Sequence, residues 1–118
     1  MPLLTMTTSA PPPSPGRRAE IFTRLSALLA RELHKPEGYV MLALSAGAAM
    51  SFAGDAGTPA CYAELKNVGH LPPARIEALS ELLCAELEAA FGVRQERIYI
   101  EFTNSDGALW GWNGETFG

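Results

Sequence analysis

The chain has 118 residues, 47% of them hydrophobic, with nine Lys and Arg against thirteen Asp and Glu and a formal net charge of −4. This length suits a single domain over residues 1–118, and the acidic balance without any basic run argues against nucleic acid as a partner. The longest apolar run, residues 39–44, is far shorter than the roughly 20 residues that cross a membrane, so we expect no membrane partner either.

The first half of the chain predicts a strand, a helix and a second strand. Residues 3–8 are typical of a strand, and the proline-rich segment 9–16 predicts a loop. Over residues 17–33 apolar side chains recur every three or four positions, which places them on one helical face. They are Ile21, Leu25, Leu28, Leu29 and Leu33. Pro36 ends the helix, and residues 39–44 form the second strand.

The second half repeats this order after residues 46–57, a segment of small residues that predicts a tight turn or hairpin. Residues 61–68 predict a third strand and residues 97–103 a fourth. Between them a helix begins at Pro72 and Pro73 and ends at Gly92. Its apolar stripe consists of Ile76, Leu79, Leu82, Leu83, Leu87 and Phe91.

The apolar positions of the two halves coincide at an offset of 58 residues. Ile21 corresponds to Leu79, and Val40 corresponds to Ile98. We therefore expect a duplicated β-α-β unit, in which each helix packs on the same strand face. Right-handed crossovers then predict an α+β fold, a four-stranded mixed sheet with both helices on one face. The other face, which carries Met41, remains apolar and uncovered, so we expect oligomers.

Pro2 is the candidate for chemistry, under one condition. Within a chain its nitrogen is an amide without basicity, whereas removal of Met1 leaves a secondary amine that can take up a proton. The reference pKa of an α-amino group is about 7.7–8.0, and burial or a nearby cation lowers it. Lys35 is a candidate cation, although on the sequence alone an interaction with the helix dipole explains its position better.

Other residue patterns indicate no metal, cofactor or classical secretion signal. Cys61 and Cys84 form no Cys-x-x-Cys motif, and His34 and His70 stand alone. The glycine-rich tail, residues 107–118, lacks the strand-loop-helix context of a phosphate loop. The N-terminus has no basic stretch before an apolar one. We expect a reduced, cytoplasmic protein without cofactors, and the sequence leaves a nonclassical route of secretion open.

Four short segments together carry a family resemblance. They are Met1-Pro2, the run His34-Lys35-Pro36-Glu37-Gly38-Tyr39, the run Arg97-Ile98-Tyr99-Ile100 and the ending Gly111-Trp112-Asn113-Gly114-Glu115-Thr116-Phe117. With these segments the chain resembles, over essentially its whole length, the macrophage migration inhibitory factor and D-dopachrome tautomerase family of the tautomerase superfamily. The resemblance implies a homotrimer whose active sites lie between neighbouring subunits.

The resemblance also implies roles for residues of one subunit. Pro2 would be the general base and acid of a keto-enol tautomerase that acts on an aromatic 2-oxo acid such as phenylpyruvate. Lys35 and the backbone at Val68 would hold the carboxylate or carbonyl of this substrate. Tyr39 would line the same pocket. No metal or cofactor is needed for such a reaction.

Further residues would complete the pocket, with two departures from the family pattern. The resemblance implies that Tyr99, Trp112 and Phe117 come from a neighbouring subunit and form an apolar wall. Glu101 stands where the best-known family member has asparagine, and it shares a strand face with Tyr99. Lys66 stands where the family has a histidine at the pocket rim. We expect these two charges to influence the choice of substrate.

Two kinds of function are consistent with these expectations. The first is an isomerase, a tautomerase of the phenylpyruvate type or similar to D-dopachrome tautomerase. The second is a trimeric, cytokine-like signalling or binding protein in which the pocket is vestigial. Removal of Met1 separates them, because only the free amine of Pro2 can act as a base.

Overall fold

The computed structural model describes residues 1–118, and four long strands and two long helices dominate it. They are β1 (Pro2–Thr8), α1 (Pro15–Leu33), β2 (Met41–Ser45), β3 (Cys61–Val68), α2 (Pro73–Phe91) and β4 (Ile98–Ser105). Short 3-10 turns lie at Glu37–Tyr39 (η1), Gln95–Arg97 (η2) and Gly107–Leu109 (η3), and a small hairpin consists of β5 (Gly111–Trp112) and β6 (Glu115–Thr116). The predicted order of strand, helix and strand in each half is confirmed.

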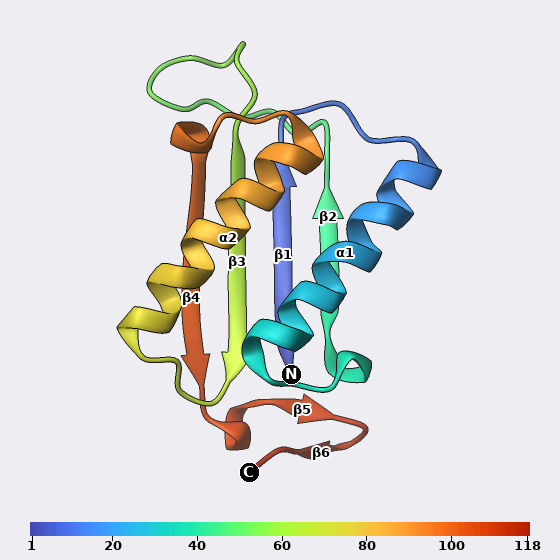
Figure 1. Ribbon diagram of the computed structural model, residues 1–118, viewed down its shortest axis with the longest axis vertical. Coiled ribbons are helices and arrows are strands. Elements are labelled where there is room, and N and C mark those ends of the chain that lie inside the picture. The colour runs from blue at the N-terminus through green and yellow to red at the C-terminus, as the bar shows by residue number, and fades with distance from the viewer.

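The long strands form one mixed sheet in the order β2-β1-β3-β4. β1 is parallel to β2, β3 is parallel to β4, and the two central strands are antiparallel to each other. Both helices cross the same face of this sheet, in front of the strands in Figure 1. This is the predicted α+β architecture, because a helical crossover joins the strands of each parallel pair.

The ends of the helices follow from local sequence. The Ser14 side chain caps α1 by accepting a backbone N–H at 3.1 Å, and Pro15 lies in the first turn, where a missing N–H leaves no bond unmade. At the other end of α1, His34 adopts a left-handed backbone conformation with φ 53°. Gly92 ends α2 in the same conformation with φ 68°, which glycine adopts without strain.

The core lies between the helices and the sheet. Alternate residues of the central strands point toward the helices, and the buried helix residues meet them there. The fully buried large side chains include Leu4, Met6, Leu25, Leu29, Leu65, Leu79, Leu83 and Leu87. The predicted stripe of α1 is confirmed, whereas the stripe predicted for α2 was too broad, because Leu82 is 36% exposed.

The 58-residue offset persists in the structure. α1 and α2 begin 58 residues apart, and so do the turns η1 and η2 that follow them. The second strand begins at Met41 rather than at Tyr39, since Val40 donates its N–H to the Glu37 carbonyl and closes a turn first. Tyr39 therefore lies in η1, outside the sheet.

The face of the sheet opposite the helices is uncovered. Met41 is 63% exposed there and Tyr99 is 65% exposed, which are high values for large apolar and aromatic side chains. No segment of the chain covers this face, as Figure 1 shows. Neither helix is long and apolar enough to pass through a lipid bilayer.

Candidate functional site

A cavity of about 220 Å³ opens at the start of β1, next to the N-terminus. Its lining consists of Met1, Pro2, Leu3, Gly38, Tyr39, Val40, Met41, Trp110, Gly111, Trp112 and Phe117. Most of these side chains are apolar, and Pro2 itself is fully buried. Figure 1 shows the β5–β6 hairpin lying across this end of the sheet, below the N-terminus. A cavity with such a lining suits a small ligand that carries an aromatic or aliphatic group.

Three aromatic rings of the same chain form one wall. The ring of Tyr39 lies 5.5 Å from that of Trp112 and 6.0 Å from that of Phe117, both edge to face. Trp112 and Phe117 are stacked with centroids 5.9 Å apart. The expectation that Trp112 and Phe117 come from a neighbouring subunit is therefore wrong. After β4 the chain turns back through η3, which brings its own C-terminal hairpin under its own N-terminus.

Gly107 makes this return of the chain possible. The Phe117 N–H donates to the Gly107 carbonyl at 3.1 Å, and a Cβ atom at position 107 would lie 2.7 Å from the Phe117 carbonyl oxygen. Any side chain at this position would push the C-terminal residues out of place. Sequence reasoning missed Gly107, because close approach of two backbone segments leaves no signal in a single sequence.

Lys35 and Val68 contact each other, although neither lines the cavity. The Lys35 Nζ donates a hydrogen bond to the Val68 carbonyl oxygen at 2.9 Å. The left-handed turn at His34 directs the chain from α1 toward this point. Gly69 follows with φ 117°, and a Cβ there would lie 3.9 Å from the Lys35 Nζ. The ammonium group is thus partly buried at the edge of the site, consistent with a role beyond that of a cation at a helix end.

The electrostatic surroundings lower the basicity of the N-terminal amine. Burial lowers the pKa of the Met1 α-amino group below its ordinary 8.0, and the Lys35 cation lowers it further. In this chain Met1 precedes Pro2, so the nitrogen of Pro2 is an amide and the Met1 amine reports on the environment. An amine in this place is more readily deprotonated near neutral pH.

Tyr99 lies far from Pro2 in its own chain. Tyr99 pairs with Tyr62 across the sheet, and Tyr62 pairs with Thr7, five residues along β1 from Pro2. At about 3.3 Å per residue this is a separation of about 16 Å. Glu101 is at the level of Thr5, also on the uncovered face. A single chain therefore cannot bring Tyr99 to its own Pro2.

The carboxylate of Glu101 contacts a tyrosine of the neighbouring strand. The Tyr62 hydroxyl lies 3.0 Å from a carboxylate oxygen of Glu64 and 3.0 Å from one of Glu101. These hydrogen bonds, first to Glu64 and then to Glu101, raise the pKa of Tyr62 to about 12. Lys66 is 4.0 Å from Glu64 and does not line the cavity around Pro2. The two charged departures from the family pattern, Glu101 and Lys66, thus belong to one group of charged side chains with Glu64 on the uncovered face.

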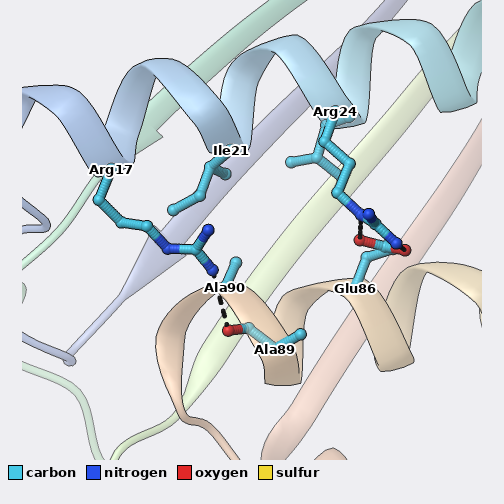
Figure 2. A pocket seen from close by; sticks show the side chains of 7 residues that line it. Arg17, Ile21, Arg24, Glu86, Ala89 and Ala90 are labelled. Atoms are coloured by element: carbon cyan, nitrogen blue, oxygen red, sulfur yellow. Dashed lines mark hydrogen bonds and ion pairs between the residues drawn. The ribbon is translucent and has the colours of Figure 1, made fainter.

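A second cavity, of about 310 Å³, lies between the helices and has no role in this site. Figure 2 shows Arg24 against Glu86 across it, with distances of 2.7 and 2.9 Å between their paired atoms. Arg17 donates to the Ala89 carbonyl at 3.3 Å. The charged groups of this cavity are therefore already paired. Elsewhere, no three His, Cys, Asp or Glu residues lie close enough together to hold a metal ion.

The chain is similar to known proteins over essentially its whole length. The profile of the family described as macrophage migration inhibitory factor (MIF) matches residues 1–118. A macrophage migration inhibitory factor homologue from Trichinella spiralis is 32% identical over 117 residues, 99% of this chain and 100% of that protein. One from Brugia malayi is 33% identical over 122 residues, covering 100% of both. The crystal structure of a homologue from Prochlorococcus marinus superposes with a TM-score of 0.92 at 40% identity, covering 98% of this chain and 99% of that one.

Proposed function

The chain belongs to the macrophage migration inhibitory factor family, and from this premise we propose that it is a keto-enol tautomerase whose base is the Pro2 amine. The observation that carries the proposal is the position of Pro2 in an aromatic-lined cavity beside Lys35, where the pKa of an amine is lowered. The reaction class is an isomerisation, and the substrate class is an aromatic 2-oxo acid such as phenylpyruvate.

The proposed chemistry requires Met1 to be removed, so that the Pro2 nitrogen becomes a secondary amine. In the keto-to-enol direction this amine takes a proton from the carbon next to the carbonyl group. The electron pair of the broken C–H bond forms the enol double bond, and the π pair of the carbonyl group moves onto its oxygen. That oxygen then takes the proton from the Pro2 ammonium, which restores the free amine. In the reverse direction the Pro2 ammonium returns the proton to carbon. General acid-base transfer of this kind typically accelerates a reaction by about 10²–10⁴-fold.

Lys35 and the aromatic wall would orient the substrate. The Lys35 ammonium does not line the cavity, but it lowers the pKa of the N-terminal amine and could pair with the carboxylate of a substrate bound there, with the backbone at Val68 beside it. Tyr39, Trp112 and Phe117 offer faces and edges to the ring of an aromatic acid. An apolar wall with one cation suits an aromatic anion better than a neutral polar substrate.

We propose that the active molecule is a homotrimer. The uncovered sheet face with Met41 and Tyr99 is the surface that a second copy would bury. Tyr99 lies about 16 Å along the strands from Pro2 of its own chain, so the Pro2 cavity to which it contributes in this proposal is that of a neighbouring subunit. Glu101, on the same face, would then approach the neighbour's substrate. Sedimentation of the purified protein tests the trimer directly.

The decisive experiment compares Pro2→Gly with the wild-type protein, both without Met1 as verified by intact mass. We expect Pro2→Gly to lose at least about 100-fold in the rate of phenylpyruvate tautomerisation while it remains folded and trimeric. Ala60→Gly, at the corresponding position of the second half, is the matched control and should retain activity. Full activity of Pro2→Gly would exclude the proline mechanism.

Glu101 offers a test of the substrate class. Glu101→Asn restores the residue that the family resemblance implies and removes a negative charge, so the Michaelis constant for phenylpyruvate should fall. Glu64→Gln removes a charge of the same cluster without changing position 101 and is the matched control. An unchanged Michaelis constant for Glu101→Asn would show that this carboxylate does not face the substrate.

A signalling or binding protein is the second candidate function, and it applies if Met1 is retained. A protein that retains Met1 has an amide at Pro2 and a methionine side chain against the cavity, so its pocket could bind a ligand but not use Pro2 as a base. Intact mass of protein isolated from its natural source decides between the two candidates. Retained Met1 would exclude proline catalysis.

We propose a cytoplasmic location from the state of the two cysteines. Cys61 and Cys84 are both free thiols. Burial, followed by the nearby Cys84, raises the pKa of the Cys61 thiol to about 11, so it resists deprotonation and oxidation. A protein without disulfides suits a reducing compartment. Fractionation of the producing cells, with an assay of the culture medium, tests this location and a nonclassical route of secretion.

A further inference from the structure

We infer that Arg97 and Phe52 are positioning residues for Tyr99. Arg97 fixes the conformation of the loop 46–60, and this loop holds Phe52 against the Tyr99 ring. This inference rests on the proposed function, because that proposal gives Tyr99 its place in the site of a neighbouring subunit. The loop, at the end of the sheet opposite the Pro2 cavity, projects beyond the strands in Figure 1.

The guanidinium of Arg97 organises this loop through its backbone. Arg97 is only 9% exposed, and its nitrogens donate to four carbonyl oxygens at 2.9–3.2 Å. These oxygens belong to Phe52, Asp55, Thr58 and Pro59. The flat fork of five N–H donors in arginine can serve several acceptors in one plane, which a lysine cannot do. The conformation of the loop therefore depends on one side chain from the turn before β4.

One carboxylate, that of Asp55, forms a long ion pair with this guanidinium at 3.9 Å, but its hydrogen bonds are made within the loop. It accepts hydrogen bonds from the Thr58 hydroxyl and from the N–H groups of Gly57 and Thr58, which lower the pKa of Asp55 to about 2. Arg97 thus acts on the backbone of the loop, while Asp55 tightens the turn within it.

The hydrogen bonds of Arg97 also fix the position of Phe52. The Arg97 guanidinium lies over the Phe52 ring, 5.3 Å from its centroid. The Phe52 ring also meets the Tyr99 ring edge to face, with centroids 5.0 Å apart and an interplanar angle of 60°. Arg97, Phe52 and Tyr99 therefore form a continuous series of contacts from a buried cation to an exposed ring.

Tyr99 needs such a support because its surroundings leave it free. Its side chain is 65% exposed on the uncovered face of the sheet, where an isolated tyrosine would sample more than one rotamer. An edge-to-face aromatic contact favours one of them. A ring held in one orientation before a neighbouring subunit docks loses less conformational freedom when it lines that subunit's cavity.

Kinetics of the Met1-free protein test this role. Phe52→Leu keeps apolar volume but removes the ring, so we expect KM for phenylpyruvate to rise about three- to tenfold with kcat within about twofold. Tyr99→Leu should raise KM similarly, and adding Phe52→Leu to it should change nothing further. Leu82→Ala, on the outer surface of α2, is the control for a change of apolar surface unrelated to the site.

A spectroscopic measurement tests the position of the Tyr99 ring without relying on catalysis. The chain has only three tyrosines, so 3-fluorotyrosine labelling gives three ¹⁹F resonances, and Tyr99→Phe identifies that of Tyr99. Phe52→Leu and Arg97→Lys should each shift and broaden it, while the resonance of Tyr39 stays in place. Phe52→Leu decides the matter if Arg97→Lys fails to fold.

The two measurements separate the possible failures. A wild-type protein without turnover would overturn the proposed function, and the ¹⁹F spectrum would still show whether Phe52 holds Tyr99. Turnover with an unchanged KM in Phe52→Leu, or an unchanged Tyr99 resonance, would overturn the positioning role and leave the tautomerase proposal standing. A parallel loss of kcat and thermal stability in Phe52→Leu would also overturn it, since that result indicates a purely structural role.

Discussion

The two halves of this protein have the same order of strand, helix and strand, but they differ where their first strands, β1 and β3, begin. One of these places is an open cavity, and the other is closed by a loop. At the 58-residue offset Pro2 corresponds to Ala60, and Tyr39 corresponds to Arg97. In the first half, an open cavity lies at the start of β1, and Pro2 is part of its lining. In the second half Ala60 is buried, and Arg97 binds the carbonyls of a covering loop.

The difference lies in the side chains and in the segments that follow each half. The segment 106–118, which follows the second half, crosses the end of the first half and contributes Trp112 and Phe117 to the cavity. The segment 46–60, which follows the first half, is held by Arg97 at the other end of the sheet. The duplicated fold therefore carries one candidate site for chemistry, the Pro2 cavity, and one structural group. That group, the Arg97 clamp, consists of Arg97 and the four loop carbonyls that it binds. Three comparisons of equivalent positions, and one of the two lysines Lys35 and Lys66, test this contrast.

The cores of the two halves should respond alike. Leu25 and Leu83 are equivalent and almost fully buried, at 1% and 0% exposed. Replacing either with alanine removes buried methyl groups and leaves a cavity, so we expect each to lower the free energy of unfolding by about 2–5 kcal/mol. Urea unfolding of the two variants measures this. A difference of more than about 2 kcal/mol would contradict the equivalence of the two helices.

The ends of the halves should respond differently. Arg97→Met preserves much of the side-chain volume but removes the charged donor of four partly buried hydrogen bonds, at an expected cost of about 2–4 kcal/mol in unfolding free energy. Tyr39→Leu, at the equivalent position, changes a side chain that is 37% exposed and should cost less than about 1 kcal/mol. Equal costs would mean that Arg97 is not a clamp. The same urea experiment applies.

The helix ends give a smaller contrast. Gly92→Ala meets no atom within 4 Å but forces alanine into a left-handed conformation, so the free energy of unfolding should fall by about 1 kcal/mol. His34→Gly relieves the same strain in the first half and should add about 0.5 kcal/mol. Thermal unfolding followed by circular dichroism compares them. Destabilisation by His34→Gly would show that the imidazole makes a compensating contact.

The pH dependence of activity gives the smallest effect. The base must be deprotonated, so kcat/KM of the Met1-free protein should rise with pH through the pKa of the Pro2 amine and then level off. Burial and the Lys35 cation, which lower the pKa of the Met1 amine, should act on the Pro2 amine in the same direction. Lys35→Gln removes the second cause of that lowering but leaves burial, so the midpoint should move upward by less than about one pH unit. Lys66→Gln is the matched control and should leave the midpoint unchanged.

The free energy of unfolding should depend on pH in the same direction. In the chain that carries Met1, between the lowered pKa of its α-amino group in the folded state and 8.0, the unfolded chain binds more protons at this amine than the folded chain does. The free energy of unfolding should therefore increase with pH across this window, and the increase should be smaller in Lys35→Gln. If the midpoint of the kcat/KM profile does not move in Lys35→Gln, burial alone lowers the pKa of the amine.

Much of the fold could be predicted because it depends on local periodicity. The spacing of Leu25 and Leu29 identified a helical face, and the correspondence of Val40 with Ile98 identified the duplication. Both follow from the fixed geometry of helices and strands, so they can be seen in one dimension. The candidate roles of Pro2 and Lys35 came from a resemblance between short motifs, and periodicity alone did not supply them.

Other features depend on which distant segments meet. That Trp112 and Phe117 line the cavity of their own chain follows from the return of the C-terminus past Gly107, where two backbones approach closely. The four acceptors of Arg97 lie in a loop some forty residues away, and no spacing in the sequence relates them. Such contacts are made by loops, whose paths no repeating pattern encodes.

The sequence by itself determined the secondary structure, the duplicated architecture and the uncovered apolar face, because each is a consequence of how apolar residues repeat along the chain. Only the tertiary structure decided which of two equivalent ends became a cavity. The physical reason is that an open cavity and a closed clamp differ by a few side chains and by the path of the covering loop. At one end Tyr39 leaves room beside Pro2, and at the other the guanidinium of Arg97 fills the equivalent space with hydrogen bonds.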